Sequence, residues 1–402
     1  MISASYGTNF IHTINASEWP QYRNNPANTG NVETLGPEKL NKVWDCDIDA
    51  KVYSSPAIVE NKVYIGSNGL NCINASTGEQ IWVSHYGEQM LSSPAVSGDK
   101  VYIGTSNHNI YCFNSSNGAK IWNYTTGGLV FSSPKLNGDK IYIGSHDNNI
   151  YCLNASTGQK IWNFSTQGWI LSTPAITEGK VYIGSFDKNI YCLDALNGTL
   201  IWSFATLDRV YSAPAVYNDK VYIGSEDGYV YCINASNGIL IWKYQTFLGV
   251  YSSVALADNK IYVGSSSNKI YCLDAMNGSS IWQYQTLGDV ESSPSIADGK
   301  VYVGSYDSNI YCLNASNGSQ ISKFETGSGV YSSPTVIDSK VYVGSLDRYI
   351  YCLGDEGEEP EESTEKSTAP KNLFDNSLIN YGGFALLVVL LLVLVWRVKT
   401  KK

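Results

Sequence analysis

The sequence predicts an all-β fold: an eight-bladed β-propeller of four-stranded antiparallel blades, followed by one C-terminal transmembrane helix. The first observation is a repeat, because the stretch from Cys72 to Trp82 returns every 40 residues as far as Cys352. The second is that each repeat holds four short runs rich in β-branched and aromatic residues, separated by Gly, Asn, Asp and Ser. Helical periodicity is absent from the repeats. A period of this length is typical of propellers and solenoids, and radial packing buries both apolar faces of such a sheet.

One repeat shows the expected strands. The copy from Leu91 to Thr126 alternates short apolar runs with turn residues, and Asn117-Gly118 is a hairpin signal. We expect its four strands at Leu91–Val96, Lys100–Thr105, Ile110–Asn114 and Lys120–Thr125.

The two ends of the repeat region complement each other. Lys42–Ile48 has the pattern of a fourth strand, with Trp44 in the place of Trp82, but no first three strands precede it. Tyr349–Leu353 is a third strand with no fourth strand after it. We therefore expect the strand around Trp44 to close the last blade, which leaves no free seam. The serines that mark the first strands give eight blades: Ser54, Ser92, Ser132, Ser172, Ser212, Ser252, Ser292 and Ser332.

Composition narrows the class of protein. The 402 residues carry a formal charge of −9, which argues against a nucleic-acid partner because phosphate binding needs a basic surface. Eight of the nine cysteines are the repeat cysteine, and Cys46 stands apart. Equivalent positions in neighbouring blades lie too far apart for a bridge, so we expect small buried thiols, with a regular set of disulfides as the alternative.

The chain divides by composition into five parts. Asp355 begins an acidic run rich in Ser, Thr and Pro, which we interpret as a disordered spacer rather than an ion-binding tail. Leu378–Val398 is apolar and long enough to span a bilayer, which we prefer to a buried core helix. The expected parts are an N-terminal segment (1–41), the propeller (42–354), an acidic linker (355–377), a transmembrane helix (378–398) and a basic cytoplasmic tail (399–402).

Charge flanking the apolar segment predicts its orientation. Arg397 and Lys399 follow it, so the tail is expected in the cytoplasm and the propeller outside. Met1–Ala16 has neither a basic n-region nor an apolar h-region and does not read as a signal peptide. Two arrangements therefore stay open: a start placed too late, or a tail-anchored protein with a cytoplasmic propeller. Repeated Asn-x-Ser/Thr sequons in turns fit a glycosylated outer surface.

The repeat resembles the tryptophan-docking motif of the pyrroloquinoline-quinone (PQQ) propeller superfamily. Cys72 stands where that motif has Ala, followed by Asn74, Gly78 and a final Trp82. In its motif and in lacking a catalytic set, the chain most resembles the non-enzymatic members, which are similar to the propeller lipoprotein of bacterial outer-membrane assembly (BamB-like). The resemblance implies that the motif's tryptophan docks the outer strand on the next blade. The further docking tryptophans are Trp122, Trp162, Trp202, Trp242 and Trp282.

The resemblance also bears on chemistry. Enzymes of the superfamily hold the quinone with an adjacent-cysteine disulfide and a Ca²⁺ bound by Glu, Asn and Asp. This chain has no Cys-Cys pair, so we expect no catalytic residue, no cofactor and no metal. Departures from the repeat near one channel mouth are candidate ligand contacts, although drift in exposed loops is the alternative; they are Trp169, Arg209, Asp289 and Glu291.

Two series of aspartates are interpreted as structural. Asp147 and its equivalents recur after Gly-Ser-x, where a carboxylate caps backbone N–H groups of a turn. Asp45, Asp47 and Asp49 alternate on one strand face, and a solvated edge is preferred there to a Ca²⁺ site.

These observations together predict a membrane-anchored, surface-displayed propeller that binds a protein partner or a small extracellular ligand without catalysis. A PQQ-dependent quinoprotein dehydrogenase and a cytoplasmic tail-anchored sensor or adaptor are the two alternatives.

Overall fold

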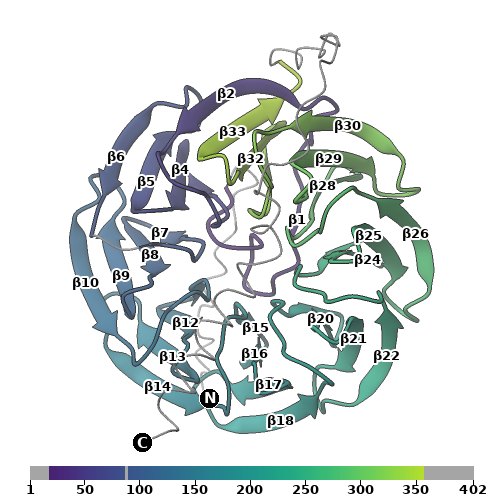
Figure 1. Ribbon diagram of the computed structural model, residues 1–402. Coiled ribbons are helices and arrows are strands. Elements are labelled where there is room, and N and C mark those ends of the chain that lie inside the picture. The colour runs from purple at the N-terminus through teal and green to yellow at the C-terminus, as the bar shows by residue number, and fades with distance from the viewer. Residues whose placement is uncertain (1–17, 87–88, 357–402) are drawn as a thin grey trace, which may run out of the picture. The chain divides into compact units, whose positions relative to one another are not determined.

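Eight sheets, each built on four antiparallel strands, stand around a central channel (Figure 1). The computed structural model describes residues 18–86 and 89–356, and its regular elements within these ranges are all β-strands. Seven sheets have four strands, and the remaining one gains a fifth from the short β1 (Asn31–Val32). The architecture confirms the predicted eight-bladed propeller.

Each blade runs from a first strand at the channel to a fourth strand at the rim. The first strands are β3 (Ala57–Val59), β7 (Ala95–Ser97), β11 (Lys135–Asn137), β15 (Ala175–Thr177), β19 (Ala215–Tyr217), β23 (Ala255–Ala257), β27 (Ser295–Ala297) and β31 (Thr335–Ile337). The second strands are β4 (Lys62–Gly66), β8 (Lys100–Gly104), β12 (Lys140–Gly144), β16 (Lys180–Gly184), β20 (Lys220–Gly224), β24 (Lys260–Ser265), β28 (Lys300–Gly304) and β32 (Lys340–Gly344). The third strands are β5 (Leu70–Asn74), β9 (Asn109–Asn114), β13 (Asn149–Asn154), β17 (Asn189–Asp194), β21 (Tyr229–Asn234), β25 (Lys269–Asp274), β29 (Asn309–Asn314) and β33 (Tyr349–Gly354). The fourth strands are β6 (Gln80–Ser84), β10 (Lys120–Thr125), β14 (Lys160–Ser165), β18 (Leu200–Ala205), β22 (Leu240–Gln245), β26 (Ser280–Gln285), β30 (Gln320–Glu325) and β2 (Asn41–Asp47).

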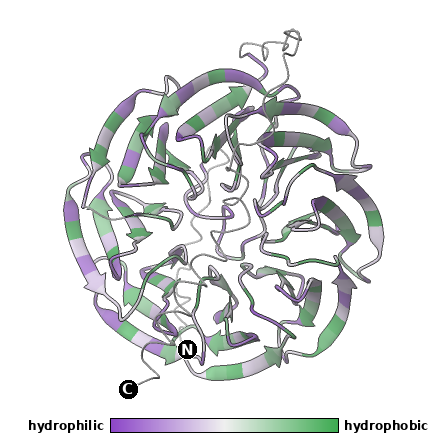
Figure 2. Ribbon diagram, in the orientation of Figure 1, coloured by the Kyte–Doolittle hydropathy of each residue, from purple (hydrophilic) through white to green (hydrophobic). Residues whose placement is uncertain are grey.

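Burial follows this order. The second and third strands are almost wholly buried, whereas fourth strands such as β10 alternate between partly buried and exposed positions. Figure 2 shows the matching hydropathy, with hydrophobic and hydrophilic residues alternating along the rim strands. This pattern is what packing of neighbouring sheets face to face requires.

The first strands are shorter than predicted. We expected Leu91–Val96, and the structure forms only β7 (Ala95–Ser97). Pro94 has no N–H to donate, and the residues before it approach the channel as a loop whose polar groups bond to the next blade. The prediction of a six-residue first strand was therefore wrong.

The ring closes as predicted. β2 pairs antiparallel with β33, and Trp44 lies opposite Cys352. Backbone hydrogen bonds thus join the N-terminal part of the chain to the last blade.

Tryptophans join neighbouring blades. Each docking Trp donates its Nε1–H to a backbone carbonyl in the turn between the third and fourth strands of the next blade, at 2.9–3.3 Å. The indole also lies under the glycine of that turn: a Cβ built on Gly158, at φ +72°, would lie 2.6 Å from Trp122 Cε3. The docking role expected from the resemblance is confirmed at Trp44, Trp82, Trp122, Trp162, Trp202, Trp242 and Trp282.

The junction of the seventh and eighth blades is different because Ser322 replaces the tryptophan. Ser322 Oγ accepts a hydrogen bond from the Leu40 N–H at 3.1 Å. Tyr302, whose equivalents bond to the next blade's turn, donates instead to the Pro37 carbonyl at 2.6 Å. Asp355 Oδ1 accepts from the Glu38 and Lys39 N–H groups. Residues 36–40 therefore take the place of the turn that the last blade lacks.

Residues 18–40, which we call the N-terminal strap, close one end of the channel. Acceptors of the strap bond to the N–H at the middle of the first strand in seven blades, at Ile58, Val96, Leu136, Ile176, Val216, Leu256 and Ile296. Lys135 is completely buried and donates to the Tyr22 and Asn25 carbonyls. The strap satisfies strand edges that would otherwise stay open.

Other expectations are answered only in part. All nine cysteines are free thiols, and the eight repeat cysteines are buried, as expected. The described residues contain no helix long and apolar enough to cross a bilayer. The expected transmembrane helix 378–398, the tail 399–402 and most of the acidic linker lie outside the described residues.

Candidate functional site

The central pocket lies between the N-terminal strap, whose Tyr22 lines it, and the other end of the channel. Its volume is about 70 Å³. Two layers line it, each contributed by the approach to the first strand in all eight blades. The mouth layer is Tyr53, Leu91, Phe131, Leu171, Tyr211, Tyr251, Glu291 and Tyr331. The hydroxyl layer, two residues further along each loop, is Ser55, Ser93, Ser133, Thr173, Ala213, Ser253, Ser293 and Ser333.

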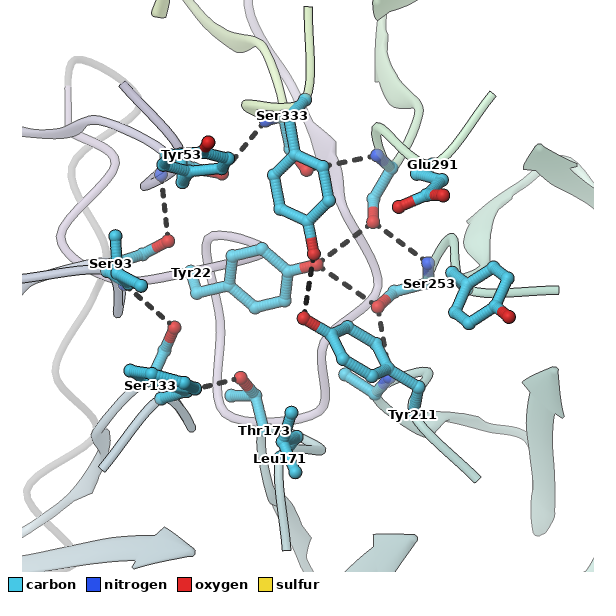
Figure 3. A pocket seen from close by; sticks show the side chains of 17 residues that line it. Tyr22, Tyr53, Ser93, Ser133, Leu171, Thr173, Tyr211, Ser253, Glu291 and Ser333 are labelled. Atoms are coloured by element: carbon cyan, nitrogen blue, oxygen red, sulfur yellow. Dashed lines mark hydrogen bonds between the residues drawn. The ribbon is translucent and has the colours of Figure 1, made fainter. Parts of the chain in front are cut away.

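The hydroxyl layer is a circle of hydrogen bonds (Figure 3). In seven blades the backbone N–H donates to the side-chain oxygen of the equivalent residue in the next blade, at 2.8–3.2 Å. The link after Thr173 is missing because Ala213 has no hydroxyl group. The layer explains why small hydroxyl residues repeat here, and it gives the channel a fixed inner wall.

Tyrosines fill most of the channel. The Tyr22 hydroxyl of the N-terminal strap bonds to Ser253 Oγ at 3.1 Å and to Ser293 Oγ at 2.9 Å, so Tyr22 is the floor of the pocket (Figure 3). Above it the hydroxyls of Tyr211 and Tyr331 meet at 2.7 Å. Burial raises the pKa of Tyr211 to about 12 and that of Tyr331 well above its usual value, so both stay neutral.

Glu291 interrupts the mouth layer. It lines the pocket beside the tyrosines, and its side chain is partly buried (Figure 3). Burial, reinforced by the charges of Asp289 and Glu226, raises the pKa of Glu291 to about 8. Burial also raises the pKa of Asp289 and of Glu226. A carboxyl group in this setting is protonated near neutral pH unless a cation stabilises its charge.

Arg209 and Trp169 flank the pocket without lining it. Arg209 lies 3.8 Å from the Glu226 carboxylate, and its guanidinium is 5.4 Å from the centre of the Phe186 ring. Trp169 is stacked on His146, with centroids 5.0 Å apart, and is 5.8 Å from Phe186. Burial lowers the pKa of His146 to about 4. The structure thus places the charge of Asp289 close to Glu291, and it connects Arg209 with Trp169 through the ring of Phe186.

Sequence reasoning missed the second set of residues at the mouth: His146, Phe186 and Glu226. Each occupies the variable position of a Gly-Ser-x-Asp turn, and its N–H bonds to the carbonyl of a loop residue such as Trp169 or Arg209. The sequence signal that could have revealed these residues is the variable x position of the Gly-Ser-x-Asp turn, because the other positions of that turn repeat.

The neighbouring aspartates have the turn role that was predicted. Asp227 Oδ1 accepts from the Tyr229 N–H, and Oδ2 accepts from Tyr231 and from the Leu207 N–H. The last bond ties the turn to the preceding loop and was not foreseen.

The described residues contain no group of His, Cys, Asp and Glu suited to hold a metal ion. Asp47 and Asp49 pair instead with Arg348 at 3.0 Å.

The central pocket does not fit a quinone cofactor. Pockets that enclose organic ligands are typically about 300–1,000 Å³, several times larger than the 70 Å³ present. The quinone carries several carboxylates, and the pocket offers them acidic groups rather than basic ones. Glu291 lines the pocket, and Asp289 and Glu226 lie nearby.

Comparison with known proteins identifies structures with the same fold. Searching curated protein sequences finds no match. Among solved structures, BamB from Moraxella catarrhalis superposes with a TM-score of 0.68 at 19% identity, covering 78% of this chain and 99% of that one. A quinohemoprotein alcohol dehydrogenase from Pseudomonas putida HK5 gives 0.77 at 12% identity, covering 90% and 84%. The computationally designed Ika8 protein gives 0.70 at 14% identity, covering 78% and 99%. These likenesses establish the fold.

The family profile described as "Outer membrane protein assembly factor BamB" matches residues 28–168 and 146–357. Those ranges include every blade and most of the N-terminal strap. The chain therefore belongs to the BamB-like family of PQQ-type propellers.

Proposed function

We propose that this protein is a non-enzymatic binding scaffold, which takes a protein partner on the face that carries the pocket mouth. The observation that carries the proposal is the small central pocket. The N-terminal strap closes one end, tyrosines occupy the interior, and only a narrow site remains at the other end. A channel of this kind supports recognition at its mouth better than enclosure of a substrate.

The mouth face also carries three exposed apolar side chains, one on each of three successive loops. Loops after the fourth, fifth and sixth blades present Leu207, Phe247 and Leu287, whose side chains are 68–87% exposed. The same loops lead to Arg209, Asp289 and Glu291. Large apolar side chains exposed on the loops that lead to a polar site support an interaction surface on this face.

Display at a membrane is part of the proposal. Its support is the apolar stretch Leu378–Val398 with basic residues after it and an acidic stretch before it. The proposed arrangement has the propeller outside the cell. Protease treatment of intact cells tests it, because a propeller that stays shielded would place this domain in the cytoplasm.

Affinity capture with matched variants tests the binding face. The detergent-solubilised full chain is used as bait in three forms: wild type, the triple variant L207S/F247S/L287S, and the control L196S/I239S/M276S. The control residues are 61–70% exposed and lie in the same three blades, in turns on the opposite face. The expected result is one partner retained by wild type and control and lost by the first triple variant.

Equal capture by both triple variants would overturn the proposed face. Capture of protein-free lipid vesicles by wild type and control alone would assign Leu207, Phe247 and Leu287 to membrane contact and would overturn the protein-partner proposal. Dye-linked alcohol oxidation after addition of the quinone and Ca²⁺ would overturn the non-enzymatic part.

A further inference from the structure

We propose that the central pocket receives a single alkylammonium or guanidinium group, presented by a lysine or arginine side chain of the partner. This inference rests on the proposed function, since it names the chemistry that the mouth face recognises. The carboxyl group of Glu291 is the anionic end of the site.

The lining of the pocket suits a cation. Four tyrosines of the mouth layer line the same pocket as Glu291: Tyr53, Tyr211, Tyr251 and Tyr331. Aromatic rings attract ammonium and guanidinium groups through the negative faces of their π-systems, and more strongly where water is scarce. The tyrosine pKa values are raised by burial, so their rings and hydroxyls stay neutral under physiological conditions.

The charges around Glu291 are unbalanced. Asp289 and Glu226 are the two carboxylates that act on it, and Arg209 is the base placed beside them. Arg209 is engaged with Glu226 and with the ring of Phe186. The nearby Asp208 pairs with Lys188 at 3.4 Å. No hydrogen bond or ion pair to the Glu291 carboxyl group is found among the described residues. A cation that enters the pocket can therefore pair with this carboxyl group.

The volume of the pocket sets the size of the ligand. A cavity of 70 Å³ holds roughly five water molecules. That space suits the last few atoms of a lysine or arginine side chain, and it is too small for a whole cofactor.

Cation binding is expected to release a proton. The free carboxyl group has a pKa of about 8, and a bound cation favours its ionised form. If only the carboxylate binds, affinity rises as pH rises and levels off above pH 8. The gain between pH 6 and pH 9 is then about 90-fold. The facing tyrosines Tyr211, Tyr251, Tyr306 and Tyr331 have pKa values raised above this range, mainly by burial. Burial also raises the pKa of Asp289 and of Glu226.

The experiment uses the solubilised full chain and small probes. N-acetyl-lysine methylamide and n-butylammonium are titrated by calorimetry at pH 6 and pH 9, with N-acetyl-norleucine methylamide as the uncharged control. Variants are E291Q, E291Y, which restores the residue of four other blades at this position, and E325Q, which removes one charge from the exposed rim strand β30. Labelled ¹³C-glutamate spectra report the Glu291 pKa directly in the wild type.

The expected result is binding of both cationic probes that strengthens at least tenfold from pH 6 to pH 9, together with a fall in the Glu291 pKa. Loss of this binding in E291Q and E291Y, and its retention in E325Q, would support the site. Equal binding of the norleucine probe, or unchanged binding in E291Q, would overturn it. A wild-type Glu291 pKa that does not move with either probe would overturn it even if the variants failed to fold.

Two further measurements distinguish a cation supplied by the partner from a free amine, and a failure of this inference from a failure of the proposed function. Displacement of the captured partner by n-butylammonium supports a basic side chain of that partner. Binding of n-butylammonium that leaves capture unchanged would assign the site to free amines and overturn the partner side chain. Partner capture through Leu207, Phe247 and Leu287 with no binding of any cationic probe would remove this inference and leave the proposed function standing.

Discussion

Replacing Glu291 with glutamine should stabilise the ligand-free propeller, and the gain should grow with pH. The folded-state pKa of about 8 lies above the ordinary value of 4.5, because burial disfavours the charged form. Below pH 4.5 the carboxyl group is protonated in both states and contributes nothing to the pH dependence. Between pH 4.5 and pH 8 only the unfolded state loses the proton, so the free energy of unfolding falls as pH rises. Glutamine does not titrate, and E291Q removes this loss.

The size of the effect follows from the two pKa values. Their difference corresponds to at most about 5 kcal/mol at pH 9. The pocket opens to solvent, which screens the charge, so we expect about 2 kcal/mol. For a propeller of this length that is about 3 °C in melting temperature.

Thermal unfolding of wild type, E291Q and E325Q at pH 5 and pH 9 measures the effect. E291Q should melt about 3 °C above the wild type at pH 9, with little difference at pH 5. E325Q controls for loss of one negative charge. A gain of E291Q that is the same at both pH values would refute the reasoning, because it would show that Glu291 does not titrate between them.

Two other substitutions test the packing of the ring. G158A should destabilise by about 2 kcal/mol more than G138A, because both glycines have positive φ but only at Gly158 would a Cβ meet Trp122; chemical denaturation measures both, and equal losses would contradict the docking geometry. A213S should add about 0.5–1 kcal/mol by giving the Thr173 N–H the acceptor present elsewhere in the hydroxyl layer, and slower exchange of that amide is the specific readout; unchanged exchange would show that the new hydroxyl does not complete the circle.

The architecture could be predicted from sequence because it depends on local, repeated chemistry. A constant period fixes the blade, and the Trp44 strand lacks only the partner that the last blade supplies. The first strand was predicted too long because Leu91–Pro94 has an apolar pattern typical of a strand. In the structure this segment forms hydrogen bonds to the next blade, as at Ser93, and it does not pair within its own sheet.

The N-terminal strap could not be predicted in the same way. It bonds mainly through backbone carbonyls, which leave no side-chain pattern in the sequence. Two irregularities in the repeat do reflect it: Lys135, where most other blades have alanine, and Ser322, where they have tryptophan. The pocket mouth was predicted only where a loop departed from its repeat, as at Glu291. Glu226 was missed because its position varies in every blade.

The N-terminal strap also has a consequence for how this protein can change length. Open repeat arrays gain and lose units readily, since each unit contacts only its neighbours. Here twelve consecutive residues, 19–30, reach the first strands of seven blades in order, and β2 then pairs with β33. Duplication or loss of one 40-residue unit would put the later acceptors out of register with their amides. The N-terminal strap thus fixes the number of blades at eight. Evolution of this chain is expected to proceed by changes in loops rather than by changes in blade number.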